Sequence, residues 1–134
     1  MGLNPPSIQQ MDENDISYAI IGAAIEVHRV LGGPGLLESV YEHALMHELI
    51  LRGHSVQRQE PLPIRYKGIV LATPLKLDLL VDRKVIVECK SVETYNKIFE
   101  SQALTYLRLT GLKLALVINF GEEVVRDGIH RVIN

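Results

Sequence analysis

The chain has 134 residues, of which 47% are hydrophobic and 22% charged, and its formal net charge is −2. This length fits one domain with a real core, and the hydrophobic content excludes a disordered chain. The single cysteine, Cys89, excludes an intrachain disulfide and an all-cysteine zinc site. The longest apolar stretch, Ala19–Ile25, falls far short of the roughly 20 residues that span a bilayer, and no basic-then-apolar signal segment opens the chain. We therefore expect a soluble, cytoplasmic protein without membrane contact.

The charge balance restricts the contacts that the chain can make with nucleic acid. A dedicated duplex-binding domain usually carries a strong positive excess, because neutralising phosphates supplies most of its affinity. Here 14 lysines and arginines face 16 aspartates and glutamates, and no run of basic residues occurs. Any contact with nucleic acid must therefore be local.

The N-terminal part of the chain is predicted to be a loose leader followed by a helix. Residues 1–14 form the expected leader, and residues 15–134 form the expected single domain. Apolar residues recur at helical spacing from about Asp15, with Asn14 or Asp15 as a plausible N-cap. The glycine-rich turn at residues 32–35 ends this helix sharply.

The rest of the chain is predicted to form one more helix, after which the spacing of apolar residues changes to that of strands. The expected elements are a helix at 37–51, an edge or irregular strand at 54–66 with a turn at Lys67-Gly68, strands at 75–81 and 85–92, a helix at 96–109, and strands at 114–119 and 128–133. This order predicts an α/β fold, an αβ sandwich in which a central mixed β-sheet is flanked by helices.

Charged and apolar residues alternate on the two central strands. Glu88 and Lys90 share one face of their strand and Cys89 faces the core, since side chains alternate along a strand. If the hairpin loop holds three residues, Asp78 lies opposite Glu88 on the same face, whereas a two-residue loop puts them on opposite faces unless a bulge intervenes. The hydrophobic pattern favours the three-residue loop. Two carboxylates and an ammonium then converge on one patch.

This patch has a chemical interpretation. Two adjacent carboxylates repel each other, which raises one pKa unless a cation lies between them. Magnesium is typically held by a few carboxylates plus waters, and substrate phosphate completes its coordination. A lysine beside such a metal can hold or activate the attacking water. The spacing therefore indicates metal-assisted hydrolysis of a phosphodiester.

The same residues resemble the core of a known family. Asp78, nine intervening residues and then Glu88-Cys89-Lys90 is similar to the motif of the PD-(D/E)XK nuclease superfamily. The chain further resembles one branch of that superfamily, the GxxExxY family, over roughly residues 16 to 133. The stretches that carry this second resemblance are Gly35-Leu36-Leu37-Glu38-Ser39-Val40-Tyr41, Ala24-Ile25-Glu26-Val27-His28, Gln102-Ala103-Leu104-Thr105-Tyr106-Leu107 and Ile118-Asn119-Phe120-Gly121.

The resemblance implies a restriction-endonuclease-like αβ sandwich and a Mg²⁺- or Mn²⁺-dependent nuclease that acts on nucleic acid, either DNA or RNA. The catalytic residues that it implies are Glu38, Asp78, Glu88, Lys90 and Gln102. The metal ligands that it implies are Asp78, Glu88, Glu38 and the backbone carbonyl of Cys89. Lys90 would position or activate the attacking water. Three further residues, Tyr41, Tyr106 and His28, are candidates for positions near the substrate.

The sequence departs from the superfamily pattern at two places. Leu77 stands where the name motif has proline, a replacement that leaves the chemistry intact. Phe99 and Glu100 occupy a stretch where a more basic or histidine-bearing sequence is expected, which bears on substrate contacts.

Simpler interpretations stay open for each signal. The residues Asp78, Glu88 and Lys90 can form a surface salt-bridge ladder, and Glu38 can be a first-turn glutamate favoured by the helix dipole. Tyr41, Tyr106 and His28 can be packing residues. His43 and His47 have the i, i+4 spacing of zinc ligands, but they lack the glutamate of the zincin motif and a third ligand.

Two other functions also stay open. A nuclease-like fold can serve as a nucleic-acid-binding or regulatory module, in which the acidic cluster is a relic. A third hypothesis for the function is a hydrolase of small phosphodiesters or nucleotides. A partner or a homodimer is one way for a chain of this size to build a substrate groove.

Overall fold

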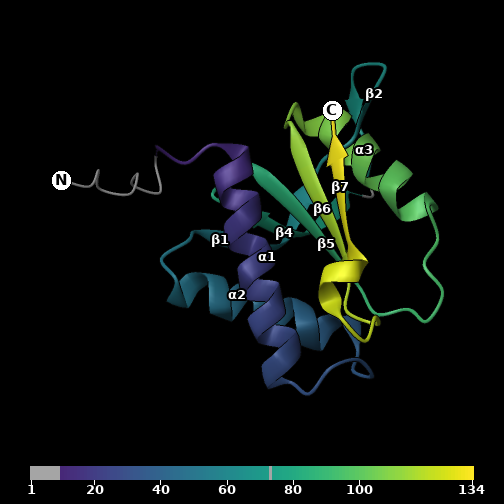
Figure 1. The fold of residues 1–134 in the computed structure, drawn as a ribbon. Helices are drawn as coiled ribbons and strands as arrows, with labels where there is room; N and C mark the ends of the chain where they lie inside the picture. Colours follow the sequence, from purple (N-terminus) through teal and green to yellow (C-terminus); the bar gives the residue numbers. More distant parts are fainter. Residues whose placement is uncertain (1–9, 73) are drawn as a thin grey trace.

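The computed structural model describes residues 10–72 and 74–134. Its elements, in chain order, are α1 (Glu13–Val30), α2 (Glu38–Leu51), β1 (Val56–Leu62), β2 (Arg65–Tyr66), β3 (Ile69–Val70), β4 (Leu75–Val81), β5 (Val85–Lys90), α3 (Ile98–Thr110), β6 (Leu114–Asn119), the 3₁₀ turn η2 (Val125–Gly128) and β7 (Ile129–Ile133) (Figure 1). Five strands form the central sheet in the order β1-β4-β5-β6-β7, and β5 and β6 are its parallel pair. The α/β sandwich with a mixed sheet is therefore confirmed.

The first helix begins earlier than the apolar period predicts. Its N-cap is Asp12, whose carboxylate accepts a hydrogen bond from the backbone of Asp15, while the Asp15 carboxylate accepts one from the backbone of Asp12. This reciprocal capping box satisfies two free N–H groups at the start of the helix. The expected N-cap at Asn14 or Asp15 is wrong, because both lie inside α1. Glu13 and Asn14 belong to the helix, and residues 1–9 of the expected leader lie outside the described residues.

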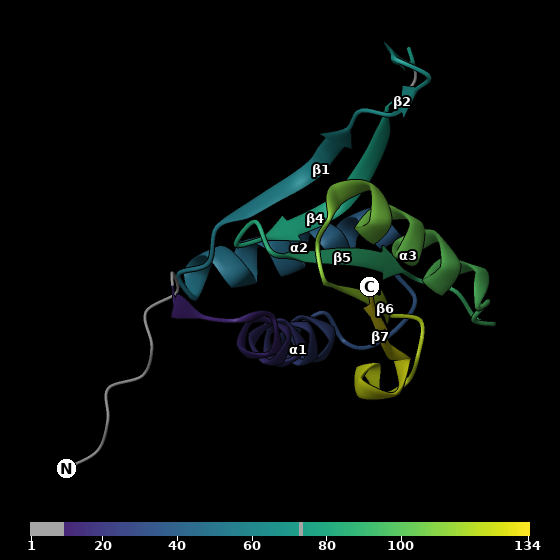
Figure 2. The same ribbon diagram turned by 90° about the horizontal axis from the view of Figure 1, so that it is seen from above.

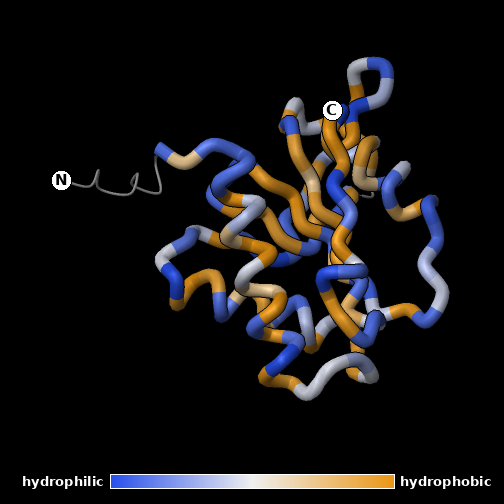
Figure 3. Tube along the Cα trace, viewed as in Figure 1, coloured by the Kyte–Doolittle hydropathy of each residue, from blue (hydrophilic) through white to orange (hydrophobic). Residues whose placement is uncertain are grey.

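Helices cover both faces of the sheet (Figure 2). The larger hydrophobic cluster joins α1 and α2 to one face, where β5 contributes Val85, Val87 and Cys89. The second cluster joins α3 to the opposite face, where β5 contributes Ile86. All six residues of β6 are buried, as its continuous apolar run predicts. Figure 3 shows hydrophobic, orange stretches along the strands of the central sheet.

The hairpin between β4 and β5 has the predicted three-residue turn. Val81 pairs with Val85, and the turn starts at Asp82, which adopts a left-handed conformation with φ of 52°. The Asp82 carboxylate accepts the backbone N–H of Ser55 at 2.9 Å and lies 2.7 Å from Nδ1 of the buried His54. The turn is thereby fastened to the segment that leads into β1, which holds the register of the two central strands.

The proline-containing segment forms an edge strand, as predicted. β1 lies at the end of the sheet and, among the described strands, pairs with β4. The turn at Lys67-Gly68 is also confirmed, and it joins β2 and β3 into a separate two-stranded sheet. β5 ends at Lys90, two residues before its expected end.

None of the helices in residues 10–72 and 74–134 has both the length and the hydropathy of a membrane-spanning segment.

Candidate active site

Asp78 and Glu88 meet where β4 and β5 separate. The ladder between the two strands ends at the pair Leu79 and Val87. Beyond it, the backbone N–H of Asp78 donates to Oε2 of Glu88 at 2.8 Å, and the backbone N–H of Cys89 donates to Oδ2 of Asp78 at 2.9 Å. The two carboxylates thus replace the missing ladder bonds, and the structure brings together the two residues that the register predicts to be adjacent. We call Asp78 and Glu88 the carboxylate pair.

The strand alternation is interrupted at Asp78. Leu77 packs in the same α3-side cluster as Leu80, whereas Leu79 packs against α1 and α2. Leu77, which stands at the proline position of the superfamily motif, is only 2% exposed. This irregularity lets the Asp78 carboxylate turn into the space where β4 and β5 separate, which we call the fork of β4 and β5.

Burial and mutual repulsion strongly perturb the Glu88 carboxyl. Glu88 is 6% exposed, and its pKa is raised from 4.5 to about 8, chiefly by desolvation and next by the negative charge of Asp78. The hydrogen bond from the Asp78 backbone and the charge of Lys90 lower the same pKa, but they only partly compensate. The carboxylate pair therefore lacks positive charge, which is the electrostatic environment that a bound cation would relieve.

The raised pKa of Glu88 predicts how stability depends on pH. Between pH 4.5 and about 8 the folded protein keeps a proton on Glu88 that the unfolded chain has lost, so the free energy of unfolding falls as pH rises through this window. We measure the free energy of unfolding in the presence of a chelator. Over this range, we expect it to fall in the wild type by more than about 1 kcal/mol beyond its fall in Glu88→Gln, and this difference is the equivalent of one pKa unit. Urea unfolding between pH 5 and pH 9 measures both. Parallel pH profiles for the two proteins would contradict the assignment.

A second buried acid, Glu42 on α2, lies beside this site and was missed from the sequence. Glu42 is 4% exposed, its carboxylate accepts hydrogen bonds from Arg58 Nε at 2.7 Å and Gln59 Nε2 at 2.8 Å, and burial together with the charge of Asp78 raises its pKa. Glu42 follows the predicted Glu38 by one helical turn, and that i, i+4 relation is the signal that could have identified it.

Glu38 reaches the end of β5 instead of the carboxylate pair. It is the first residue of α2, and its Oε2 accepts the backbone N–H of Ser91 at 3.3 Å. The Ser91 hydroxyl in turn donates to the carbonyl of Leu36 at 2.7 Å. The loop between α1 and α2 is thus tied to the residue that follows Lys90.

Tyr41 supports this loop from the core. Its ring is fully buried and stacks on Phe120 with centroids 4.7 Å apart, while its hydroxyl donates to the Gly33 carbonyl at 2.6 Å and accepts from the Leu36 N–H at 3.2 Å. Gly35 has a φ of +114°, a conformation that side-chain-bearing residues rarely adopt. The glycine, glutamate and tyrosine of the 35–41 motif therefore act together to place the loop against β5.

A second set of hydrogen bonds fixes the chain after β5. The side-chain amide of Asn119, at the end of β6, accepts the N–H of Val92 and donates to its carbonyl, both at 3.0 Å. Gly121 passes so close to Val92 that an added Cβ would lie against the Val92 carbonyl oxygen and 2.9 Å from its carbonyl carbon. The stretch from Asn119 to Gly121 thereby holds the segment that leaves the site.

Lys90 points toward α3. Its Nζ lies 4.5 Å from the centroid of the Phe99 ring, and it makes no ion pair with any acidic side chain of residues 10–72 and 74–134. Lys90 shares a cavity of about 600 Å³ with Phe99, Gln102 and Thr105. The structure thus places Gln102 beside Lys90, but it leaves the lysine on an aromatic ring and not between the carboxylates.

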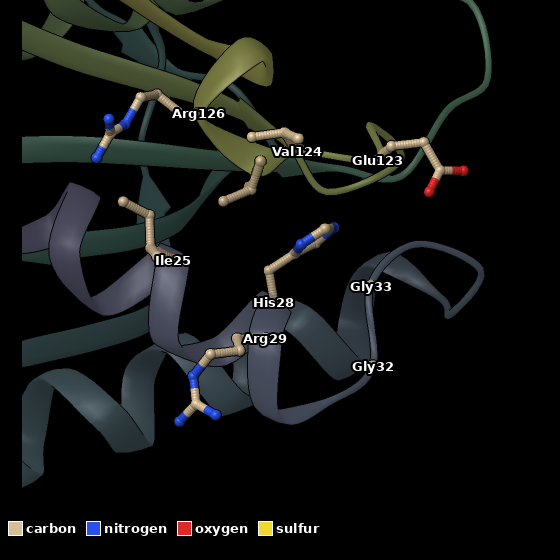
Figure 4. Close-up of a pocket in the computed structure, with 9 residues that line it drawn as sticks. Ile25, His28, Arg29, Gly32, Gly33, Glu123, Val124 and Arg126 are labelled. Atoms are coloured by element: carbon tan, nitrogen blue, oxygen red, sulfur yellow. The ribbon is translucent and has the colours of Figure 1, made fainter.

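The other two candidates for positions near the substrate lie in different surroundings. Tyr106 on α3 is 6% exposed, and its pKa is raised by burial and by the charges of Glu88 and Asp78. His28 lies at the end of α1, and its Nε2 is 3.2 Å from the carbonyl oxygen of Phe120. Figure 4 shows His28 pointing from α1 toward the segment that carries Val124, across a cavity of about 510 Å³ that none of the catalytic candidates lines.

No preformed metal cage is present in the described part of the chain. Within residues 10–72 and 74–134, no three or more histidine, cysteine or acidic side chains form a group that could hold a metal ion. His43 and His47 are exposed on α2 beside Arg58. The buried Glu88 and half-buried Asp78 carboxylates, short of positive charge, nevertheless fit Mg²⁺ or Mn²⁺, because magnesium is usually bound through one or two carboxylates and completes its shell with water and substrate phosphate.

Cys89 separates the two charged residues of the motif and faces the other side of the sheet, as predicted. It is 1% exposed within the α1–α2 cluster, and burial followed by the charge of Asp78 raises the pKa of its thiol. A buried neutral thiol is unreactive packing material.

Comparison with known proteins identifies the family of the chain. A sequence profile of the PD-(D/E)XK nuclease superfamily matches residues 14–132. No curated protein and no solved structure matches the chain. The match covers α1 and α2, all seven strands and α3, and so includes every element that surrounds the carboxylate pair.

Proposed function

Given that the chain belongs to the PD-(D/E)XK nuclease superfamily, we propose that it is a divalent-metal-dependent nuclease that hydrolyses phosphodiester bonds in nucleic acid. The observation that carries this proposal is the carboxylate pair at the fork of β4 and β5, with Lys90 two residues further along β5. Two acidic oxygen donors and one ammonium are the groups with which a protein can hold a metal ion and a water against a phosphate.

Each residue of the site has a role in the proposed reaction. Asp78 and Glu88 hold Mg²⁺ or Mn²⁺ together with the backbone carbonyl of Cys89, and Glu38 completes the acidic surroundings. The bound cation supplies Lewis-acid stabilisation of the phosphate and of the leaving oxygen. Lys90 donates a hydrogen bond to the attacking water and favours its deprotonated form through its positive charge. Gln102, which lines the same cavity as Lys90, contacts the substrate beside the scissile bond.

We further propose that the chain belongs to the GxxExxY branch, in which the name motif supports the site indirectly. Gly35 allows the left-handed turn, Glu38 accepts the Ser91 N–H, and Tyr41 holds the loop between them through its hydroxyl. Ser91 directly follows Lys90. The motif therefore positions the end of β5, which explains how a glycine and a buried tyrosine can matter for chemistry that neither performs.

The proposed function is tested by metal-dependent turnover. Purified protein stripped with chelator is incubated with end-labelled single-stranded, duplex and branched DNA and RNA, with Mg²⁺, Mn²⁺ or no metal. Cleavage that needs added metal supports the proposal. Salt-sensitive binding without cleavage would support a binding or regulatory module instead. Cleavage of model diesters alone would support a small-molecule hydrolase.

A second copy of the chain stays the proposed source of additional groove surface. Light scattering of the purified protein tests it directly, because the monomer mass is 15.0 kDa. A measured mass of about twice that value supports the homodimer, and a mass equal to it contradicts the proposal.

A further inference from the structure

The ammonium of Lys90 lies on an aromatic ring, although an acidic pair is close to it. Glu88 lies two residues away on the same face of β5, close enough for the charge of Lys90 to be felt there. Nevertheless, Lys90 forms no ion pair with an acidic side chain of the described residues, and its Nζ sits 4.5 Å from the centre of the Phe99 ring. This distance is well within the range of a cation–π interaction.

The Phe99 ring is itself held in place by a short series of aromatic contacts. Tyr95, in the loop before α3, meets Phe99 edge to face, with centroids 5.5 Å apart and planes at 69°. The other neighbour of Tyr95 is His130 on β7, whose ring stacks on it at 3.9 Å with planes at 8°. Rings from the sheet, the loop and the helix therefore orient the face of Phe99 that Lys90 contacts. This support distinguishes the contact between Lys90 and Phe99 from a chance contact on a mobile surface.

An alternative position for Lys90 would interfere with the carboxylate pair. Asp78 and Glu88 each accept one backbone N–H, and Oδ1 of Asp78 also accepts Gln59 Nε2 at 3.5 Å, which leaves further lone pairs on both carboxylates. A lysine ammonium that bound those lone pairs would neutralise the pair and occupy the oxygens that a metal ion needs. The face of a phenylalanine attracts the same ammonium through its quadrupole and uses no carboxylate oxygen.

We propose that Phe99 is a positioning residue that holds the Lys90 ammonium out of ion pairs with Asp78 and Glu88, so that both carboxylates stay open to a divalent cation. The proposal deepens the proposed function and rests on it. It also accounts for an aromatic residue in a stretch where a basic or histidine-bearing sequence was expected.

The contact is tested first without metal and without activity. Lysines are dimethylated with ¹³C-formaldehyde, and the Lys90 methyl signal is assigned by its loss in Lys90→Arg. The ring current of Phe99 shifts this signal upfield in the wild type, and we expect the shift to be lost in Phe99→Leu and kept in Phe99→Tyr. Lys67, 5.4 Å from the Tyr66 ring, is a matched control: Tyr66→Leu moves the Lys67 signal and leaves that of Lys90 unchanged. A Lys90 signal that is unshifted in the wild type overturns the proposal.

The consequence for the carboxylates is tested by Mn²⁺ titration of unmethylated protein. We expect Phe99→Leu to bind Mn²⁺ about three- to fivefold more weakly, because the released Lys90 ammonium competes for Asp78 and Glu88. Phe99→Tyr should restore wild-type affinity, and Tyr66→Leu should leave it unchanged. Equal or tighter binding by a folded Phe99→Leu overturns the positioning role. Absence of Mn²⁺ binding by the wild type would contradict the proposed function, and with it the role of Phe99 in keeping the carboxylates open. The Lys90 methyl signal would still report whether Lys90 contacts Phe99.

Discussion

Asp78→Asn is expected to reduce metal-dependent cleavage by about 10²–10⁴-fold while the protein stays folded. The asparagine oxygen can still accept the N–H of Cys89, which the Asp78 carboxylate accepts at 2.9 Å, so the fork between β4 and β5 keeps its hydrogen bond. What the substitution removes is the negative charge on one side of the carboxylate pair. Initial rates at saturating Mg²⁺, with circular dichroism as the measure of folding, quantify the effect.

Two comparisons make this result specific. Asp127→Asn makes the same chemical change on the exposed η2 turn and should leave the rate unchanged. Lys90→Ala should reduce cleavage about as strongly as Asp78→Asn does, whereas Lys97→Ala, at the exposed start of α3, should leave the rate unchanged. Wild-type rates in folded Asp78→Asn or Lys90→Ala would remove that residue from the mechanism.

Gly121→Ala is expected to lower the free energy of unfolding by about 2–4 kcal/mol. The added methyl group would lie against the backbone of Val92, which cannot rotate away as a side chain can. Val92 is also bonded through both its N–H and its carbonyl to Asn119, so a shift of its backbone breaks those two hydrogen bonds. Urea unfolding monitored by circular dichroism measures the loss.

Gly22→Ala is the matched control for this substitution. Gly22 lies inside α1, and the nearest atom to its added Cβ is Nη1 of the flexible Arg52 side chain at 3.4 Å. Alanine is the better helix former by about 1 kcal/mol, so this variant should be as stable as the wild type or more stable. Gly121→Ala that unfolds at the wild-type urea concentration would show that Val92 is not tightly held.

The register of the β4–β5 hairpin is predictable because an apolar residue stands at every second position on both sides of the turn. The three-residue turn that pairs Val81 with Val85 puts both residues on the α1–α2 side of the sheet, and the adjacency of Asp78 and Glu88 follows from that register. The buried run of β6 and its parallel pairing with β5 likewise follow from a continuous apolar segment after a helix.

Other features depend on contacts that a linear pattern does not reveal. Glu42 lies next to Tyr41 and between other buried residues of α2, where a helical pattern predicts apolar packing, and its partners Arg58 and Gln59 come from β1. The Asp12 cap was missed because the apolar period begins only at Ile16, one turn after the cap. The contact between Lys90 and Phe99 joins a strand to the following helix, and only the folded chain shows which of its neighbours the ammonium selects.

Calorimetric titration of Mn²⁺ into metal-stripped protein tests most directly whether the carboxylate pair is a metal site. Wild-type protein should bind Mn²⁺ with an affinity that rises with pH, because the raised pKa of Glu88, about 8, means that the metal must displace a proton at neutral pH. Glu88→Gln should lose most of this binding, since it keeps an oxygen that can accept the Asp78 N–H but has no charge. Equal Mn²⁺ binding by both proteins, or none by either, would contradict a metal site at the fork of β4 and β5.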